Sequence, residues 1–310
     1  MKIVFFGTSD FAVPSLIRLN GCHKIAAVVT KSDKPKGRHL LSRPSPVKSK
    51  AQELNIPLFF IDDIPEGYAA KELSRYRADL FVVIAYGAIL SSNILSIPKF
   101  YTIGLHASLL PKYRGAAPIN WAILNGDAES GVTTFRLNEK MDVGDIILQR
   151  AIAVLDSDNA EALYLKLSLT GADLLLETIG LIERRKEQFI KQREDEATYA
   201  PKLKKEDGVI DWTKSAIQIH NQVRAMYNWP SAFSNLGGHT IKIWQSNVVD
   251  SKAKGIDKPG AVIKVEPNGI FVACGEGALC IKELQAEGGR RMPVADYLLG
   301  HKILVSDFFL

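Results

Sequence analysis

The sequence contains no apolar run of about 18 residues, the length that a helix needs to cross a membrane, so no membrane association is expected. It also contains only three cysteines, Cys22, Cys274 and Cys280. A small and odd number of cysteines cannot form a complete disulfide framework and is typical of a reducing compartment. We therefore expect a cytoplasmic protein, with a monomer as the default oligomeric state.

Two chemical motifs are missing as well. The six histidines include no H-E-x-x-H pattern, and Cys274 and Cys280 have no partner pair, so no metal site is expected. The turn Gly7–Ala12 follows an apolar run and opens a helical pattern, but it lacks G-x-G-x-x-G. A pyrophosphate cradle is thus not supported, and the turn is either a tight strand-to-helix connection or a ligand-contacting loop.

The 310 residues, 46% of them apolar and 24% charged, suffice for two globular domains. The first half alternates short apolar runs with helical patterns, as in a mainly parallel sheet covered by helices on both faces. Because ligands bind beyond the carboxyl ends of such strands, we expect a nucleotide-binding-like α/β domain with its site at that edge. Strands are predicted at 2–6, 24–29, 57–60, 80–85 and 102–107, and helices at 14–20, 47–54, 68–76 and 160–186.

The pattern of apolar and turn-forming residues changes from about Thr198 onward. One helical pattern at 215–226 is followed by short apolar runs broken by Gly, Asn and Pro, which predict a small antiparallel, OB-like β-barrel. The predicted strands are 240–249, 261–265, 269–273 and 278–284. We predict a catalytic domain at 1–188, a linker at 189–206 and a C-terminal domain at 207–310.

Residues 31–50 carry seven basic side chains against one acid, Asp33, and several prolines preclude regular structure for most of this segment. A basic, irregular loop can follow a phosphate backbone. A solvated surface loop has the same composition, so the charge alone leaves both interpretations open. The basic residues are Lys31, Lys34, Lys36, Arg38, Arg43, Lys48 and Lys50.

His106 follows a predicted strand and lies where an imidazole could exchange protons with a ligand. Asp142 lies in a turn between two further apolar strands and is its candidate partner, because a carboxylate can orient a histidine and raise its basicity. A lone histidine is more often structural, and the sequence alone does not establish that the two are neighbours. Ser108 has no G-x-S-x-G context, so it is a poor nucleophile candidate.

Together these segments resemble the folate-dependent formyltransferases over nearly the whole chain. The most specific stretch is Ser108–Pro111 followed by Arg114–Pro118. The loop Pro44–Lys48 and the C-terminal block that contains Thr198–Leu203 and Trp229-Pro230 are similar to the branch of the family that acts on charged tRNA.

The resemblance implies transfer of the formyl group of 10-formyltetrahydrofolate, as co-substrate, to the α-amino group of methionyl initiator tRNA in translation initiation. It implies catalysis by His106, as a hydrogen-bond donor to the oxyanion, and by Asp142. It places folate contacts at Ser108, Leu109, Leu110, Pro111, Ala85, Tyr86 and Gly87. It places tRNA contacts at Lys34, Lys36, Arg38 and Arg43, with the C-terminal domain assisting.

The sequence departs from the family pattern at one catalytic position. The family has an asparagine two residues before the histidine, and this chain has Gly104 there. Loss of one oxyanion donor typically costs about 10²–10³ in rate. If the missing side chain limits catalysis, Gly104→Asn is expected to accelerate the reaction.

Three other functions remain open at this stage. A formyl-folate hydrolase fits Gly104 but does not account for the basic loop. A folate-dependent sugar-amine formyltransferase shares the His106–Pro118 stretch but does not need the loop or the C-terminal block. A non-enzymatic RNA-binding protein could retain the fold after losing activity.

Overall fold

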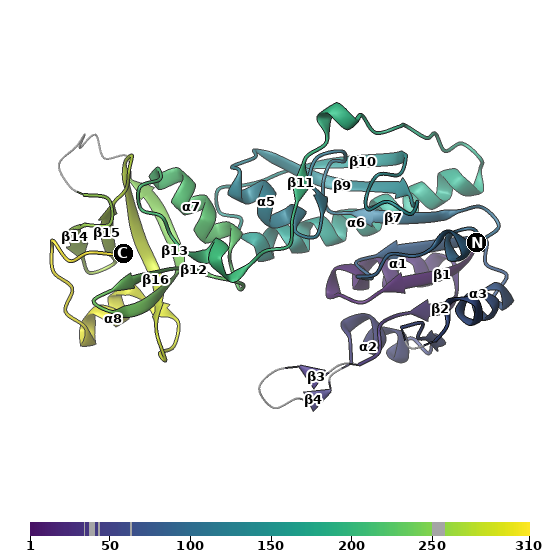
Figure 1. Cartoon of the computed structure of the whole chain (residues 1–310), viewed down its shortest axis with the longest axis horizontal. Coiled ribbons are helices and arrows are strands. Elements are labelled where there is room, and N and C mark those ends of the chain that lie inside the picture. Colours follow the sequence, from purple (N-terminus) through teal and green to yellow (C-terminus); the bar gives the residue numbers. More distant parts are fainter. Residues whose placement is uncertain (34, 37–40, 43, 63, 250–257) are drawn as a thin grey trace. The chain divides into compact units, whose positions relative to one another are not determined.

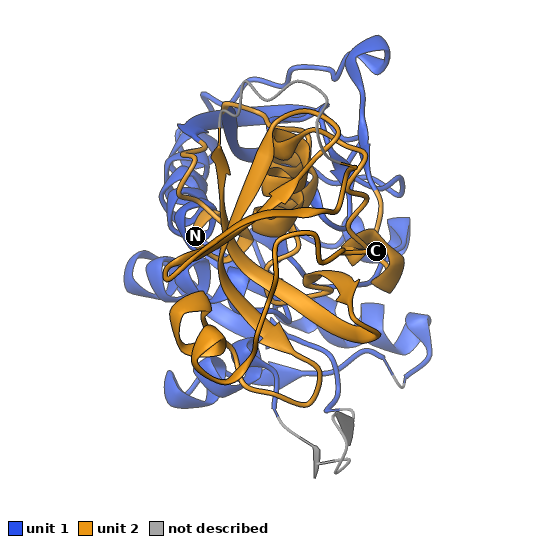
Figure 2. Cartoon of the chain, turned by 90° about the vertical axis from the view of Figure 1, so that its left-hand side faces the viewer, with its two compact units in different colours: residues 1–118, 129–153, 164–200 blue, residues 119–128, 154–163, 201–310 orange. Residues whose placement is uncertain are grey.

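The chain folds into two compact units in the computed structural model, which describes residues 1–33, 35–36, 41–42, 44–62, 64–249 and 258–310 (Figure 2). Unit 1 comprises Met1–Pro118, Glu129–Ala153 and Tyr164–Ala200. Unit 2 comprises Ile119–Ala128, Val154–Leu163 and Pro201–Leu310. Unit 2 thus includes two short stretches from within the predicted catalytic domain. The predicted domain limits, 1–188, 189–206 and 207–310, stay a prediction.

The described part of unit 1 contains a seven-stranded sheet in the order β10-β9-β7-β6-β1-β2-β5 (Figure 1). The five strands from β7 to β5 run parallel to one another, while β9 and β10 form an antiparallel edge. Every one of the predicted strands in this domain is present, and the parallel α/β class is confirmed. The strands are β1 (Lys2–Gly7), β2 (Lys24–Val29), β5 (Leu58–Phe59), β6 (Leu80–Ile84), β7 (Thr102–His106), β9 (Glu129–Arg136) and β10 (Ile146–Ala153).

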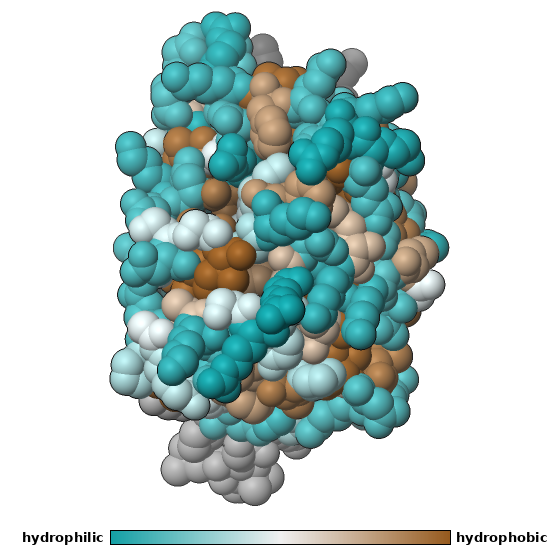
Figure 3. Space-filling view, turned by 90° about the vertical axis from the view of Figure 1, so that its right-hand side faces the viewer, coloured by the Kyte–Doolittle hydropathy of each residue, from teal (hydrophilic) through white to brown (hydrophobic). Residues whose placement is uncertain are grey.

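Three helices of the first half lie at the predicted segments 14–20, 47–54 and 68–76, and two shorter helices, at 92–95 and 118–124, were not predicted. Helix α2 begins at Pro46 because the Ser45 hydroxyl accepts a hydrogen bond from the amide of Lys48, which satisfies one of the free N–H groups of the first turn. The others are α1 (Val13–Cys22), α3 (Glu66–Arg75), α4 (Ser92–Leu95) and α5 (Pro118–Leu124). The face of the molecule in Figure 3 is mostly hydrophilic, with smaller apolar patches.

Helix α6 (Ala160–Glu183) packs along the sheet of unit 1 (Figure 1). Leu167, Leu174 and Ile179 are fully or almost fully buried, and the Thr178 hydroxyl lies 2.8 Å from the Thr134 hydroxyl on β9. The helix thus fixes the antiparallel edge of the sheet through both apolar and polar contacts. Neither α6 nor another helix among the described residues is long and apolar enough to cross a bilayer.

Unit 2 contains an antiparallel sheet in the order β12-β13-β16-β15-β14, with β17 paired to β16. The C-terminal residues close it, because Phe309 bridges to Leu236 at the end of β12 while Phe308 bridges to Ala261, just before β14. The predicted small β-barrel is confirmed. Its elements are α7 (Ala216–Ala225), β12 (Ala232–Leu236), β13 (His239–Val249), β14 (Val262–Glu266), β15 (Gly269–Ala273), β16 (Ala278–Ala286), β17 (Met292–Pro293) and α8 (Val294–Gly300).

Candidate active site

His106 is the last residue of β7 and lies at the carboxyl edge of the parallel strands. All five residues of β7 are buried, and His106 itself is 8% exposed. Its Nε2 atom is 2.8 Å from the backbone oxygen of Tyr113. A carbonyl oxygen only accepts, so Nε2 carries a proton and donates a hydrogen bond to the Tyr113 oxygen. The other ring nitrogen, Nδ1, faces the site.

Asp142 comes from the connection between β9 and β10 and reaches the same edge. Its Oδ1 atom is 3.7 Å from Nδ1 of His106, and its Oδ2 atom accepts a hydrogen bond of 2.9 Å from the amide of Gly115. The separation from the imidazole is too long for a direct hydrogen bond. The structure therefore brings the two predicted catalytic residues together, while their roles stay a prediction.

The turn that presents Asp142 has an unusual backbone. Asp142 has a φ angle of 55°, in the left-handed region, which costs a non-glycine residue on the order of 1–3 kcal/mol. Two residues later, a Cβ atom at Gly144 would lie 1.6 Å from the backbone oxygen of Arg136, so only glycine fits there. The orientation of Asp142 is thus held by its surroundings rather than by local backbone preference.

The loop after His106 contains the first predicted set of folate contacts, Ser108 to Pro111. The Thr133 hydroxyl donates to the backbone oxygen of Ser108 and accepts from the amide of Leu110, so β9 fixes this loop. The Ser108 hydroxyl donates to the backbone oxygen of Lys112 at 2.6 Å and is 1% exposed. Leu109 and Pro111 are half-buried and face outward more than Ser108 and Leu110 do.

Ala85, Tyr86 and Gly87, the second set, follow β6 directly beside the end of β7. Ala85 and Gly87 are exposed, with φ angles of 44° and 79°. Tyr86 points inward, where its ring packs edge-to-face on Phe6, and burial raises the pKa of its phenol well above the ordinary value. Tyr86 can therefore offer a ligand its backbone but not its ring.

The position of the missing family asparagine is filled by neighbouring side chains. Gly104 pairs with Phe135 across β7 and β9. A Cβ atom at Gly104 would lie 2.4 Å from Cδ1 of Leu137 and 2.8 Å from Cε1 of Phe135. Phe135 belongs to a small buried cluster with Leu110 and Ile146. A side chain at position 104 would therefore require Leu137 and Phe135 to move.

The basic loop is only partly described. Lys34, Arg38 and Arg43 lie outside the described residues, and Lys36 is placed through its backbone in β3 (Pro35–Lys36), which pairs with β4 (Leu41–Ser42). The other three basic residues have partners within the fold: Lys31 donates to the backbone oxygen of Gly87, Lys48 pairs with Asp33, and Lys50 pairs with Glu53. The predicted tRNA contacts stay a prediction that rests on the first four residues.

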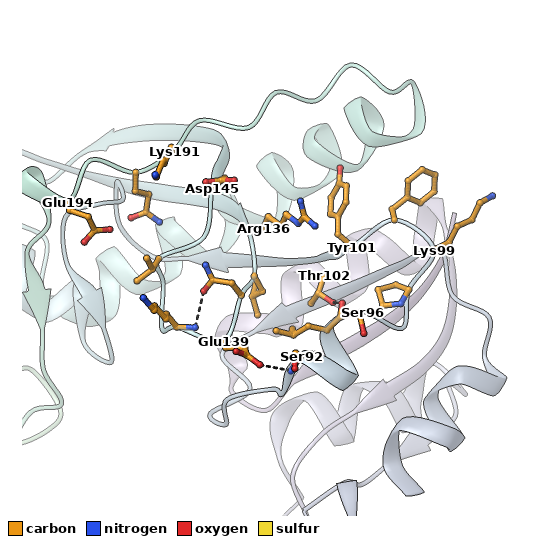
Figure 4. Close-up of a pocket in the computed structure, with 18 residues that line it drawn as sticks. Ser92, Ser96, Lys99, Tyr101, Thr102, Arg136, Glu139, Asp145, Lys191 and Glu194 are labelled. Atoms are coloured by element: carbon orange, nitrogen blue, oxygen red, sulfur yellow. Dashed lines mark hydrogen bonds between the residues drawn. The ribbon is translucent and has the colours of Figure 1, made fainter. Parts of the chain in front are cut away.

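A hollow of about 760 Å³ on unit 1 reaches the Asp142 turn at Val143 and Gln192, but neither His106 nor Asp142 lines it (Figure 4). Arg136 there stacks over the ring of Tyr101, and Thr102, at the opposite end of β7 from His106, forms part of the wall. The hollow has no paired acid and base of the kind found at His106. We therefore place the candidate active site at the His106 edge. Within the described residues, no three His, Cys, Asp or Glu side chains group as metal ligands would.

The histidine and the aspartate lie at the carboxyl edge of the parallel strands, where α/β enzymes bind their ligands. Residues 1–179 match the formyl transferase family, and residues 202–302 match the formyl transferase C-terminal domain. The chain belongs to the formyl transferase family.

Curated relatives resemble the chain over nearly its whole length. It is 41% identical over 304 residues to the methionyl-tRNA formyltransferase of Geobacter sulfurreducens, which covers 98% of this chain and 95% of the relative. It is 43% identical over 305 residues to the methionyl-tRNA formyltransferase of Caldanaerobacter subterraneus subsp. tengcongensis, with 98% of each chain covered.

Solved structures agree on the fold. An N-formyltransferase from Helicobacter canadensis, in complex with folinic acid and dTDP-3-aminofucose, has a TM-score of 0.69 at 22% identity and covers 94% of this chain and 100% of its own. The sugar 3N-formyl transferase WlaRD has a TM-score of 0.67 at 23% identity and covers 91% of this chain and 96% of its own. At this level of identity the likeness concerns the fold alone.

Proposed function

We propose that this chain transfers the formyl group of 10-formyltetrahydrofolate to the α-amino group of the methionine carried by initiator tRNA. The observation that carries the proposal is the similarity of 41–43% identity to methionyl-tRNA formyltransferases, which covers 98% of this chain and so spans both units. The sugar formyltransferase structures are similar at 22–23% identity, so that alternative is less favoured.

The edge of the sheet at His106 suits a flat, partly polar ligand such as a reduced folate. Ala85 and Gly87 are exposed, and the apolar Leu109 and Pro111 are half-buried. These segments follow two adjacent parallel strands, β6 and β7, which is where α/β sheets bind ligands. The formyl group on N10 of the folate would then lie near His106.

The α-amino group of the methionine must be neutral to attack the formyl carbon, which is accessible near neutral pH because ordinary α-amino pKa values are about 8. Attack forms the new C–N bond and a tetrahedral intermediate. Nδ1 of His106 accepts the proton that the amine loses, since Nε2 is already bonded to Tyr113. The same proton then passes to N10 of the folate as the C–N10 bond breaks, so the charges balance.

Asp142 stabilises the imidazolium that forms while His106 holds this proton. A carboxylate oxygen at 3.7 Å lowers the free energy of the charged ring and keeps Nδ1 pointed at the reacting nitrogen atoms. His106 can donate to the oxyanion through Nδ1 only after that atom has been protonated, so proton transfer comes first.

A single-turnover assay tests the proposal. The wild-type protein is mixed with 10-formyltetrahydrofolate and methionyl initiator tRNA, and formylmethionyl-tRNA is measured beside released formate. Formation of formylmethionyl-tRNA supports the proposal. Formate release without transfer would favour a hydrolase, transfer to an amino sugar nucleotide would favour a sugar enzyme, and tRNA binding without any reaction would favour an RNA-binding protein.

A further inference from the structure

Gln192 is a buried polar residue next to the candidate active site that the reaction above does not use. Among residues 191–196 it alone is buried, at 5% exposure, and its five neighbours are exposed. A buried amide needs hydrogen-bond partners, because leaving it unpaired is costly. The identity of those partners indicates what the side chain does.

The Gln192 amide joins Arg114 to the turn that carries Asp142. Its Nε2 atom donates to the backbone oxygens of Asp142 at 2.8 Å and Gly144 at 2.7 Å. Its Oε1 atom accepts from Nε of Arg114 at 3.0 Å and from Nη2 at 2.9 Å. Arginine can only donate and carbonyl oxygens can only accept, so the amide fits in one orientation.

Arg114 anchors the other end of this connection. It is 2% exposed, and its guanidinium forms a bidentate pair with Glu194, at 2.9 and 3.0 Å. It belongs to β8 (Arg114–Gly115), which pairs with β11 (Tyr199–Ala200). Its two chain neighbours contact the catalytic pair directly: the Tyr113 oxygen accepts from His106, and the Gly115 amide donates to Asp142.

Gln192 therefore fixes the backbone of the Asp142 turn relative to the segment that holds both catalytic side chains. It donates hydrogen bonds to the residues before and after Val143, Asp142 and Gly144. Asp142 has a left-handed backbone that an aspartate does not favour by itself, so these bonds help to hold the turn. We infer that Gln192 is a positioning residue for formyl transfer, which sets the separation between Asp142 and His106 without touching the substrate. This inference rests on the proposed function.

A double-mutant cycle tests the inference. Gln192→Ala is expected to lower kcat at least tenfold while changing the KM for 10-formyltetrahydrofolate less than threefold, since the folate contacts lie on other segments. In the Asp142→Asn background, Gln192→Ala is expected to lower kcat less than twofold, because a residue that acts through Asp142 has nothing left to position. Gln192→Met, which keeps the volume but has no donors, is expected to match Gln192→Ala.

Gln222 supplies a matched control in unit 2. It is 7% exposed, and its Nε2 atom likewise donates to two backbone oxygens, those of Asp207 and Val209. Gln222→Ala is expected to lower the unfolding temperature about as much as Gln192→Ala and to leave kcat unchanged, which separates lost stability from lost positioning. If Gln192→Ala does not fold at the assay temperature, the double-mutant cycle is measured with Gln192→Met instead.

Three results would overturn the inference: an unchanged kcat in folded Gln192→Ala or Gln192→Met, an equal loss of kcat in the wild-type and Asp142→Asn backgrounds, or an equal loss of kcat in Gln222→Ala. Each presupposes that the wild-type protein forms formylmethionyl-tRNA. A failure of the proposed function itself would instead appear as a wild-type protein without that activity, so the two failures are distinguishable.

Discussion

Gly104 lies directly opposite Phe135 in the β7–β9 ladder, and the aromatic ring occupies the space that a side chain at position 104 would need. An aromatic residue across from a glycine covers the exposed backbone of the neighbouring strand. The glycine and its covering ring therefore form one packing unit, two residues before His106. A change at either position alone disturbs the other.

The first prediction follows from this packing. Gly104→Asn is expected to destabilise the protein by about 1–3 kcal/mol, the usual cost of overpacking a core, and to lower formyl transfer rather than accelerate it. This revises the expectation drawn from the sequence. Urea unfolding and the single-turnover assay measure the two effects.

Gly104→Ala isolates the steric part, because its Cβ atom already lies 2.4 Å from Cδ1 of Leu137. Adding Leu137→Ala is expected to recover part of the lost stability. Gly67→Ala in α3 is a matched control, since nothing lies within 4 Å of a Cβ atom there, and it should be neutral or stabilising. A Gly104→Asn variant that is as stable as wild type and faster would refute this account.

The second prediction concerns the catalytic pair. His106→Ala and Asp142→Asn are each expected to lower kcat by at least about a hundredfold, the scale of acid–base and electrostatic roles. Both side chains lie at the edge of the sheet rather than in its core, so the folded state should survive, which circular dichroism can check. Near-full activity in either variant would mean that the proton passes through another group.

The position of Asp142 could not be anticipated from strand order, because β9, which precedes it, runs antiparallel to β7 and ends beside the opposite end of that strand. The position of His106 could be anticipated, because it ends a buried apolar strand of the parallel part of the sheet. Regular apolar runs such as those of β1 and β2 were predictable for a related reason, since burial on both faces demands uninterrupted apolar residues. Position along the sheet then follows from strand order. Local pattern and elementary topology thus suffice for the fold and for the place of His106, whereas the place of Asp142 depends on tertiary contacts of its turn.

Gln192 and Tyr86 were not predictable in the same way. Gln192 lies in a polar stretch whose composition indicates a linker, and its burial depends on which backbone oxygens the folded chain places beside it. The inward orientation of Tyr86 comes directly after Ala85 in the left-handed region, a conformation that no residue pattern signals. Contacts between side chains and distant backbone atoms are set by tertiary structure and have no local period.

The third prediction concerns pH. His220 on α7 is 6% exposed, and its ring nitrogens lie 3.0 Å from the Ser246 hydroxyl and 3.5 Å from the Asp156 carboxylate. Burial lowers the pKa of His220 below its usual 6.5, and Arg224 lowers it further, although Asp156 opposes this. The unfolded chain then binds a proton more readily than the folded protein does, so stability falls as pH drops from about 6.5 toward the folded-state pKa.

Urea unfolding between about pH 7.5 and 5.5 measures this loss. His220→Gln is expected to flatten the decline, because glutamine cannot be protonated in this range. The pH dependence that remains in His220→Gln should include a contribution from His23, because burial lowers the pKa of that residue as well. His239→Gln, at an exposed histidine of the same unit, is the matched control. Parallel curves for wild type and His220→Gln would show that His220 does not contribute to the pH dependence.

The last prediction concerns the basic loop, where Lys31, Lys48 and Lys50 already have partners in the fold. The charge available to a phosphate backbone then rests on Lys34, Lys36, Arg38 and Arg43. Each phosphate that such a residue neutralises releases condensed counterions, so the logarithm of the tRNA affinity should fall linearly with the logarithm of the salt concentration.

Arg38→Ala is expected to weaken binding of charged tRNA by about 1–3 kcal/mol and to leave folate affinity unchanged. Arg75→Ala removes the same charge from α3, where Arg75 pairs with Glu72, and should change tRNA affinity little. Salt-insensitive binding by the wild type, or equal affinity of Arg38→Ala and wild type, would assign the loop to the solvated surface.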